Sequence, residues 1–246
     1  MQKLHILAIG VHPDDLELSA AGTLIKHARM GQAVGILDLT AGELGSRGTA
    51  ELRLQEAQAA AKVMGMAVRE CAHMADGFFA NDEAHQRKLI TYLRKYQPDI
   101  VIANAVADRH PDHGRAGKLI ADACFLSGLR MIKTEYDGRE QEAWRPKRVF
   151  HMIQDRFMEP TLVVDVTDTH ETKMEAIKCY GSQFHNPNAN SSEPETYISK
   201  SGFLEAIEAR SLLLGKRIGV KYGEGFVCEN VPGVSNLDQL LLPDMA

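Results

Sequence analysis

The chain of 246 residues is 44% hydrophobic and 25% charged, which is ordinary for a globular protein, and its length suits one large domain. Its formal charge of −5 and its lack of long lysine- or arginine-rich runs argue against nucleic acid as a partner. No stretch approaches the roughly 18 apolar residues of a membrane-spanning helix, so a membrane partner is not expected either.

Short β-branched apolar runs alternate with helical patterns along the first half of the chain. Such alternation is typical of a Rossmann-like α/β fold, with a mostly parallel sheet and helices on both faces. The expected strands are Leu4–Val11, Val34–Leu39, Val68–Met74, Asp99–Ala105, Val149–Gln154, Leu162–Val166 and Gly225–Val227. The expected helices are Asp15–Met30, Glu51–Met64, a segment from Asn81 or Asp82 to Tyr96, His113–Leu129, Thr169–Tyr180 and Phe203–Lys216.

The rest of the chain indicates a single domain over residues 1–246. The polar stretch Asn186–Ser201 is expected to be a long surface loop, and no linker or internal repeat divides the sequence. The four cysteines are far apart and lack Cys-x-x-Cys spacing, which favours reduced thiols in the cytoplasm. The apolar run at the N-terminus ends at His12, too early for a signal peptide.

Two clusters rich in histidine and aspartate follow predicted strands. His12-Pro13-Asp14-Asp15 follows the first strand, and Asp108-Arg109-His110-Pro111-Asp112-His113 follows the strand Asp99–Ala105. Ligands bind beyond the carboxyl ends of the strands in open parallel sheets. In a doubly wound sheet these two strands can be neighbours, so we expect the clusters to face each other.

The clusters contain the ligand types of a catalytic zinc site. His12 and Asp15 can bend onto one point, and His113 completes a set of two histidines and one carboxylate. Such a set accepts Zn2+ and also Fe2+. Three protein ligands leave a position for water, and Asp14 beside them can act as its general base.

The remaining members of the second cluster suit supporting roles. His110 can stabilise the oxyanion as a cation or protonate the leaving amine, and Asp112 can hold a histidine in the required tautomer. Each residue alone is more often an ordinary polar residue at a strand end or a helix start. Two dense clusters at two strand ends favour the catalytic reading.

Two other features leave alternatives open. The glycine-rich loop Thr40–Thr49 can approach a ligand closely or be an ordinary surface loop. Arg53, at the start of the next helix, can bind a substrate carboxylate or form a salt bridge with Glu56. A dinucleotide-binding domain is a poor alternative because no G-x-G-x-x-G follows the first strand, whereas a non-catalytic metal- or sugar-binding module stays open.

The motifs resemble those of the PIG-L/LmbE superfamily of zinc-dependent N-acetylglucosaminyl deacetylases. They stand here as Val11-His12-Pro13-Asp14-Asp15 and His110-Pro111-Asp112-His113. Within it, the sequence is most similar to the deacetylases of bacillithiol biosynthesis. That second similarity rests on Asp38–Thr40, Gly42–Thr49, Glu51–Arg53, Asp108–His113, Ser182–Phe184 and Glu224–Phe226.

The resemblance implies a site and a substrate. Zinc would be held by His12, Asp15 and His113, with Asp14 as general base and a protonated His110 assisting. The implied reaction removes acetyl from N-acetyl-glucosaminyl-malate; the alternative is another small N-acetylglucosamine derivative, such as a chitin disaccharide. The implied substrate-binding residues are Arg47, Arg53 and Arg109, because arginine forks match carboxylates.

The resemblance also implies a homo-oligomer, often a hexamer in such relatives. In one respect the sequence departs from the pattern. Bacillus-type relatives carry a tyrosine, proposed to contact the oxyanion, at the position that best matches Phe203. Tyr197, in the adjacent loop, is a candidate substitute.

Overall fold

A seven-stranded sheet forms the centre of the computed structural model, which describes residues 2–184 and 193–242. Its strands are β1 (Ile6–Gly10), β2 (Val34–Asp38), β3 (Val68–Cys71), β4 (Ile100–Ala103), β7 (Arg148–Met152), β8 (Leu162–Asp165) and β9 (Gly223–Cys228). Their spatial order is β3-β2-β1-β4-β7-β9-β8. Within this sheet β9 alone runs antiparallel to its neighbours, which confirms the mostly parallel sheet.

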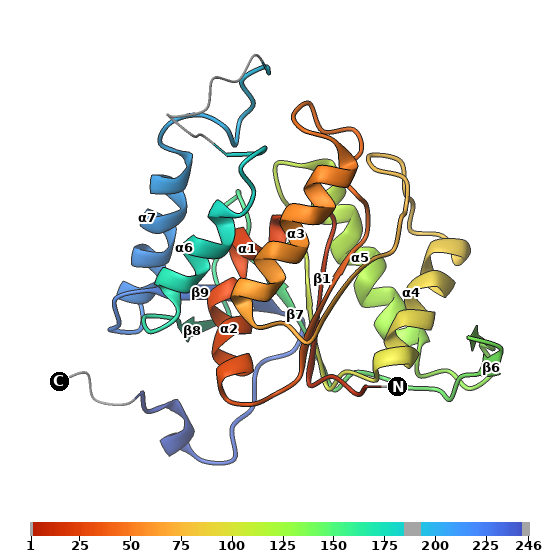
Figure 1. Ribbon diagram of the computed structural model, residues 1–246. Coiled ribbons are helices and arrows are strands. Elements are labelled where there is room, and N and C mark those ends of the chain that lie inside the picture. Colours follow the sequence, from red (N-terminus) through yellow and green to blue (C-terminus); the bar gives the residue numbers. More distant parts are fainter. Residues whose placement is uncertain (1, 185–192, 243–246) are drawn as a thin grey trace.

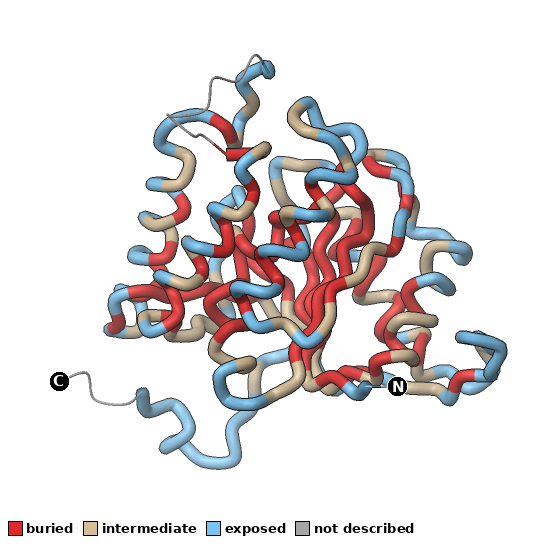
Figure 2. The backbone as a smooth tube through the Cα atoms, viewed as in Figure 1, coloured by how far each residue is buried: buried red, intermediate tan, exposed pale blue. Residues whose placement is uncertain are grey.

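Helices cover both faces of the sheet (Figure 1). They are α1 (Asp15–Ser19), α2 (Ala21–Arg29), α3 (Ala50–Met64), α4 (Glu83–Tyr96), α5 (Pro111–Leu126), α6 (His170–Lys178) and α7 (Phe203–Lys216). Side chains alternate along β1: Leu7 and Ile9 pack toward α4 and α5, whereas Ile6 and Ala8 pack toward α2, α3 and α6. The buried core therefore lies on both sides of the sheet (Figure 2).

The order of the strands reverses at β1. Ile6 of β1 pairs in parallel with Val34 of β2 and with Ile100 of β4. The chain therefore builds outward through β2 and β3 on one side of β1, and through β4 and β7 on the other. Loops that leave the carboxyl ends of β1 and β4 diverge around a crevice at such a switch point. The predicted adjacency of the two strands is confirmed.

The single helix predicted over Asp15–Met30 is wrong. It is interrupted at Ala20, where φ is −139° and ψ is 0°, and α1 and α2 are separate helices. The cause is a carboxylate from the other end of the chain. Glu224 of β9 accepts hydrogen bonds from the backbone N–H groups of Gly22 and Thr23, at 2.9 and 2.7 Å. These free N–H groups belong to the first turn of α2, so a distant residue caps a new helix there.

Smaller differences concern the periphery. A short hairpin of β5 (Glu135–Tyr136) and β6 (Arg139–Glu140), and a 3-10 helix η1 (Leu237–Leu240), were not expected. Residues 193–201 contain neither helix nor strand, as the loop prediction requires, and residues 186–192 lie outside the described part. None of the described helices is long and apolar enough to cross a membrane.

Candidate functional site

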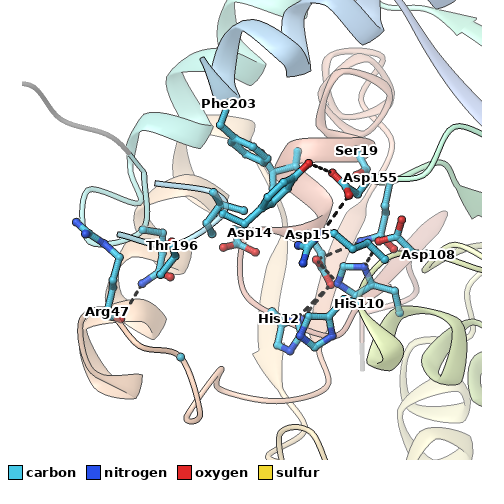
Figure 3. A pocket seen from close by; sticks show the side chains of 18 of the residues that line it. His12, Asp14, Asp15, Ser19, Arg47, Asp108, His110, Asp155, Thr196 and Phe203 are labelled. Carbon is cyan, nitrogen blue, oxygen red and sulfur yellow. Dashed lines mark hydrogen bonds and ion pairs between the residues drawn. The ribbon is translucent and has the colours of Figure 1, made fainter. Parts of the chain in front are cut away.

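A cavity of about 320 Å³ opens at the carboxyl ends of β1 and β4 (Figure 3). This volume falls at the lower end of the range for small-molecule sites. All but one of the predicted site residues line it; the exception is Asp112. The lining members are His12, Asp14, Asp15, Arg47, Arg53, Arg109, His110 and His113.

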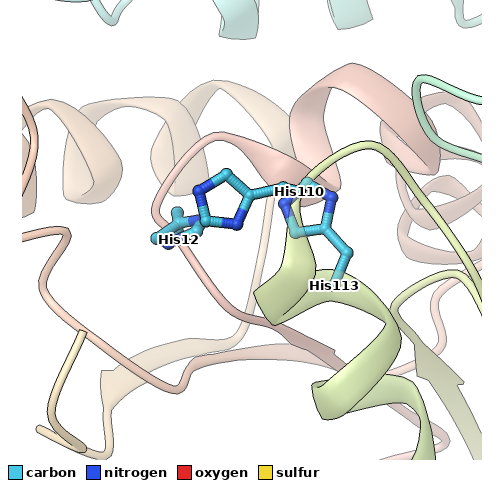
Figure 4. Close-up of side chains that lie close together, drawn as sticks. All are labelled: His12, His110 and His113. Carbon is cyan, nitrogen blue, oxygen red and sulfur yellow. The ribbon is translucent and has the colours of Figure 1, made fainter. Parts of the chain in front are cut away.

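Three histidine rings meet at the floor of this cavity (Figure 4). His12 comes from the loop after β1, whereas His110 and His113 come from the start of α5. The ring centroid of His110 lies 4.9 Å from that of His12 and 5.1 Å from that of His113, and the His12 and His113 centroids are 5.7 Å apart. The two clusters therefore converge as the topology predicts.

Asp15 lies between two of these histidines. Its Oδ1 is 3.1 Å from His113 Nε2, and its Oδ2 is 3.9 Å from His12 Nδ1. The backbone N–H groups of Val11 and His12 both donate to Oδ2, at 3.1 Å each, and so fix the carboxylate at the start of α1. The Asp15 carboxylate thus lies beside a ring nitrogen of His113 and, at a longer distance, beside one of His12.

The opposite nitrogen of each of these two histidines contacts a carboxylate. His12 Nε2 lies 2.9 Å from Asp76 Oδ1, and His113 Nδ1 lies 2.6 Å from Asp108 Oδ2. Metal-binding histidines usually donate their second ring N–H to such a group, which orients the ring. His12 and His113 therefore have the outer partners that are usual for metal-binding histidines, and with the Asp15 carboxylate they provide the donor types of a metal site.

The groups of donor atoms that lie closest together at this place differ from the predicted set of His12, Asp15 and His113. Ring nitrogens of His12, His110 and His113 lie within 4.8 Å of one another, and so do single donor atoms of His12, Asp76 and Asp112. Both combinations include His12, which makes it the common member of every candidate ligand set among the described residues.

The protonation states of His113 and Asp15 depend on each other. Burial opposes ionisation of His113, but the carboxylates of Asp15 and Asp108 raise its pKa to about 10. Burial likewise opposes ionisation of Asp15, yet the charge of His113 and its hydrogen bond hold the Asp15 pKa below its usual value. Without metal, a proton on His113 neutralises charge at the position that a cation would take, so metal binding must release it.

Asp14 stands apart from the ligands and carries backbone strain. Its φ of 125° is rare outside glycine, and such outliers cluster at functional sites. Arg53 Nη2 donates to Asp14 Oδ2 at 2.7 Å, while Oδ1 has no hydrogen-bond partner among the described residues. Burial raises the pKa of Asp14 despite the opposing charge of Arg53. The free oxygen suits a proton acceptor.

His110 forms the N-cap of α5, and this arrangement opposes the predicted cation. The backbone N–H of Asp112 donates to His110 Nδ1 at 3.3 Å, so that nitrogen is an acceptor and the ring proton resides on Nε2. Burial, together with the positive charges of His12 and His113, lowers the pKa of His110. The structure therefore favours a neutral His110 that donates through Nε2.

Asp112 lies beneath the pocket floor. Its carboxylate accepts from the Gly77 backbone N–H at 2.9 Å and from Arg115 at 3.1 Å, and it lies 3.8 Å from His12 Nε2. Shorter carboxylate contacts to His12 and His113 come from Asp76 and Asp108, for which no role was predicted. Both residues follow the carboxyl ends of strands, and that position was the available signal.

The predicted arginines differ in their surroundings. Arg53 is buried and pairs with Asp14, whereas Glu56 accepts from the backbone N–H and the hydroxyl of Ser182; the alternative pair of Arg53 with Glu56 is therefore wrong. Arg47 donates through Nε to the Ser182 carbonyl at 2.9 Å.

Arg109 belongs to a polar group at the rim of the cavity. Its Nε donates to Asp155 at 3.0 Å, and its guanidinium lies 4.1 Å from the ring centroid of Tyr197. The Tyr197 hydroxyl donates to the same carboxylate at 2.8 Å, and its ring packs edge-on against Phe203. Asp155 thus orders the rim, a role that no sequence motif indicated.

The comparison with known families agrees with this geometry. The model of the family described as PIG-L, GlcNAc-PI de-N-acetylase, matches residues 7–124, which contain both clusters. The chain belongs to the PIG-L family. Family membership was predicted from the two motifs and is confirmed.

Relatives of this PIG-L chain include enzymes with different reactions. Diacetylchitobiose deacetylase of Thermococcus kodakarensis is 26% identical over 93% of this chain and 84% of its own length. A 4-oxalmesaconate hydratase of Pseudomonas putida is 26% identical over 73% of this chain and 74% of its own. A conserved protein of Thermus thermophilus is 33% identical, with a TM-score of 0.83 over 94% of this chain and 97% of that one.

Proposed function

We propose that the chain is a zinc-dependent amide hydrolase that removes the acetyl group from N-acetyl-glucosaminyl-malate in bacillithiol biosynthesis. The observation that carries the proposal is the pairing of two oriented histidines and Asp15 with a separate carboxylate, Asp14, that has a free oxygen. A site built only to bind a metal or a sugar would not need that free carboxylate.

His12, Asp15 and His113 would hold the metal, as their outer carboxylates favour. When bound, zinc would polarise the amide carbonyl and lower the pKa of water. Iron(II) suits the same donor set and is the alternative metal in the cell.

Asp14 moves the proton in this mechanism. Its free Oδ1 takes a proton from the attacking water while Arg53 holds Oδ2 in place. As the C–N bond breaks, the same proton passes to the amine, and acetate and free amine leave. The raised pKa of Asp14 favours it over His110 as the group that carries the proton.

His110 stabilises the charge that develops on the carbonyl oxygen. Its neutral ring presents Nε2–H, because the helix N–H of Asp112 occupies Nδ1. A donor fixed before the reaction stabilises an oxyanion without the cost of reorienting water.

A carboxylate on the substrate suits the rim. The two terminal nitrogens of Arg109 have no hydrogen-bond partner among the described residues, because Asp155 takes only Nε. A free guanidinium fork matches a carboxylate such as that of malate. Arg47 lines the same cavity and is the second candidate for this contact.

Diacetylchitobiose deacetylase among the relatives supports the alternative of a neutral N-acetylglucosamine derivative. The test is kcat/KM for the malate conjugate beside diacetylchitobiose and free N-acetylglucosamine, with zinc-loaded protein. Preference for the malate conjugate supports the proposal, and preference for diacetylchitobiose replaces the substrate but keeps the chemistry. Activity on none, with hydration of 4-oxalmesaconate, would favour the reaction of the hydratase relative.

We also propose that the protein is cytoplasmic and self-associates. All four cysteines are free thiols, as a reducing compartment favours. The C-terminal segment exposes large apolar side chains: Val231 at 92%, Leu237 at 77%, Leu240 at 64% and Leu241 at 74%. A second copy of the chain would cover them, and light scattering measures this; a monomer at all concentrations would contradict it.

A further inference from the structure

Two side-chain amides contact the carboxylate of Asp15. Asn104 Nδ2 donates to Asp15 Oδ2 at 3.0 Å, and Gln154 Nε2 donates to Asp15 Oδ1 at 3.1 Å. Asn104 follows the end of β4, and Gln154 follows β7. All three side chains are buried, with at most 4% of any residue exposed. Asn104 therefore reaches Asp15 from the end of β4, and Gln154 reaches it from the end of β7.

The two amides have only one arrangement that satisfies their neighbours. The backbone N–H of Ala105 donates to Gln154 Oε1 at 3.1 Å, and Asn104 Nδ2 donates to the same oxygen at 2.9 Å. Because a backbone N–H can only donate, the Gln154 oxygen must face Ala105 and its Nε2 must face Asp15. The donor onto Asp15 is thus fixed by the network and cannot turn around.

Gln154 is held in turn from outside the network. Arg210 of α7 donates to the backbone carbonyl of Gln154, and also to the carbonyl of Leu18 at 2.7 Å. Leu18 lies in α1, the helix that begins at Asp15. The Arg210 guanidinium therefore connects the backbone at Gln154 to α1, the helix that begins at Asp15.

The two adjacent aspartates have contrasting partners. Arg53, a cation, holds Asp14, whereas the side chains that contact Asp15 besides His12 and His113 are neutral amides. A cation beside Asp15 would repel a metal ion, but an amide fixes the carboxylate and leaves its charge for the metal. We propose that Asn104 and Gln154 are positioning residues that orient Asp15 for the metal and thereby set the affinity of the site; this rests on the proposed zinc site.

The test is the zinc affinity of the protein, measured by competition with a chromophoric chelator. Outer partners of metal ligands typically contribute about 10- to 100-fold to affinity. Gln154→Met and Asn104→Leu remove one donor each at similar volume, and we expect each to weaken zinc binding by about that factor. The control is Asp155→Asn, beside Gln154 in the chain but without contact to Asp15, which should bind zinc within about twofold of the native protein.

Two further measurements separate the outcomes. Thermal melting of the metal-free variants shows whether they fold. Gln154→Glu covers the case in which they do not, because it keeps the acceptor for Ala105 and replaces the donor that faces Asp15 by a carboxylate oxygen. Its cobalt(II) form should show a changed visible spectrum. Native affinity in the folded variants, or an unchanged cobalt spectrum, would overturn the inference. A native protein that fails to bind zinc would instead overturn the proposed function.

Discussion

Arg53 Nη2 lies 2.7 Å from Asp14 Oδ2, and both side chains are buried in the wall of the cavity. The guanidinium opposes the effect of burial on the Asp14 pKa, so its removal should raise that pKa further. For Arg53→Met we expect the acidic limb of the pH–rate profile to move to higher pH by about one unit or more. Arg47→Met, which removes an arginine without contact to Asp14, should leave the limb in place. An unmoved limb in Arg53→Met would exclude Asp14 as the group that titrates.

His110 should donate a hydrogen bond to the oxyanion, and its ring should not titrate in the pH–rate profile. We expect His110→Ala to lower kcat by about 10²- to 10³-fold, the usual effect of losing one oxyanion donor. Both limbs of the pH–rate profile should persist, because Nδ1 accepts from Asp112 and the ring stays neutral. Loss of a limb in this variant would assign the proton transfer to His110 instead of Asp14.

His113 should stabilise the metal-free protein in a pH-dependent manner. Its pKa is raised from 6.5 to about 10, so the charged form contributes stability that is complete below pH 6.5 and is lost as the pH rises through about 10. Removing one partner of such a buried pair costs about 3 kcal/mol. Urea unfolding of metal-free native protein and His113→Gln should show this difference at pH 6 and its decline toward pH 10. A difference independent of pH would contradict the assigned charge.

The rim should control substrate choice more than turnover. For Arg109→Met we expect the KM of the malate conjugate to rise by about 10- to 100-fold, the cost of a lost charged hydrogen bond, while that of free N-acetylglucosamine changes little. Tyr197→Phe loses only its bond to Asp155, so its KM should rise by a few fold with kcat nearly constant. A large loss of kcat in Tyr197→Phe would show that Tyr197 contacts the reacting atoms.

The glycine-rich loop after β2 should resist changes beside Arg53. Gly42 has a φ of +66°, and a Cβ there would collide with the Arg53 guanidinium. Gly42→Ala should therefore displace Arg53 from Asp14 and reproduce part of the Arg53→Met pH shift. Gly138→Ala, with a similar φ of +72° but open space around it, is the matched control for backbone strain alone. Equal pH–rate profiles for the two variants would show that Gly42 has no effect on the pKa of Asp14.

The sequence predicted what depends on strand order and local pattern. The apolar runs at β1 and β4 indicated buried parallel strands, and their neighbouring positions brought His12 to His113. The break at Ala20 escaped prediction because its cause, Glu224, lies far away in the chain. Asp76 and Gln154 were missed for the same reason: each contacts the site only after folding, and neither belongs to a motif.

The most direct test of the proposed function is acetate and free-amine release from N-acetyl-glucosaminyl-malate by zinc-loaded native protein and by Asp14→Asn. The substitution removes the proton acceptor and leaves His12, Asp15 and His113 unchanged. We expect equal release of both products by the native protein, and a rate about 10²- to 10⁴-fold lower in the variant at equal zinc content. Undiminished turnover in Asp14→Asn, or no amine release by the zinc-loaded native protein, would contradict it.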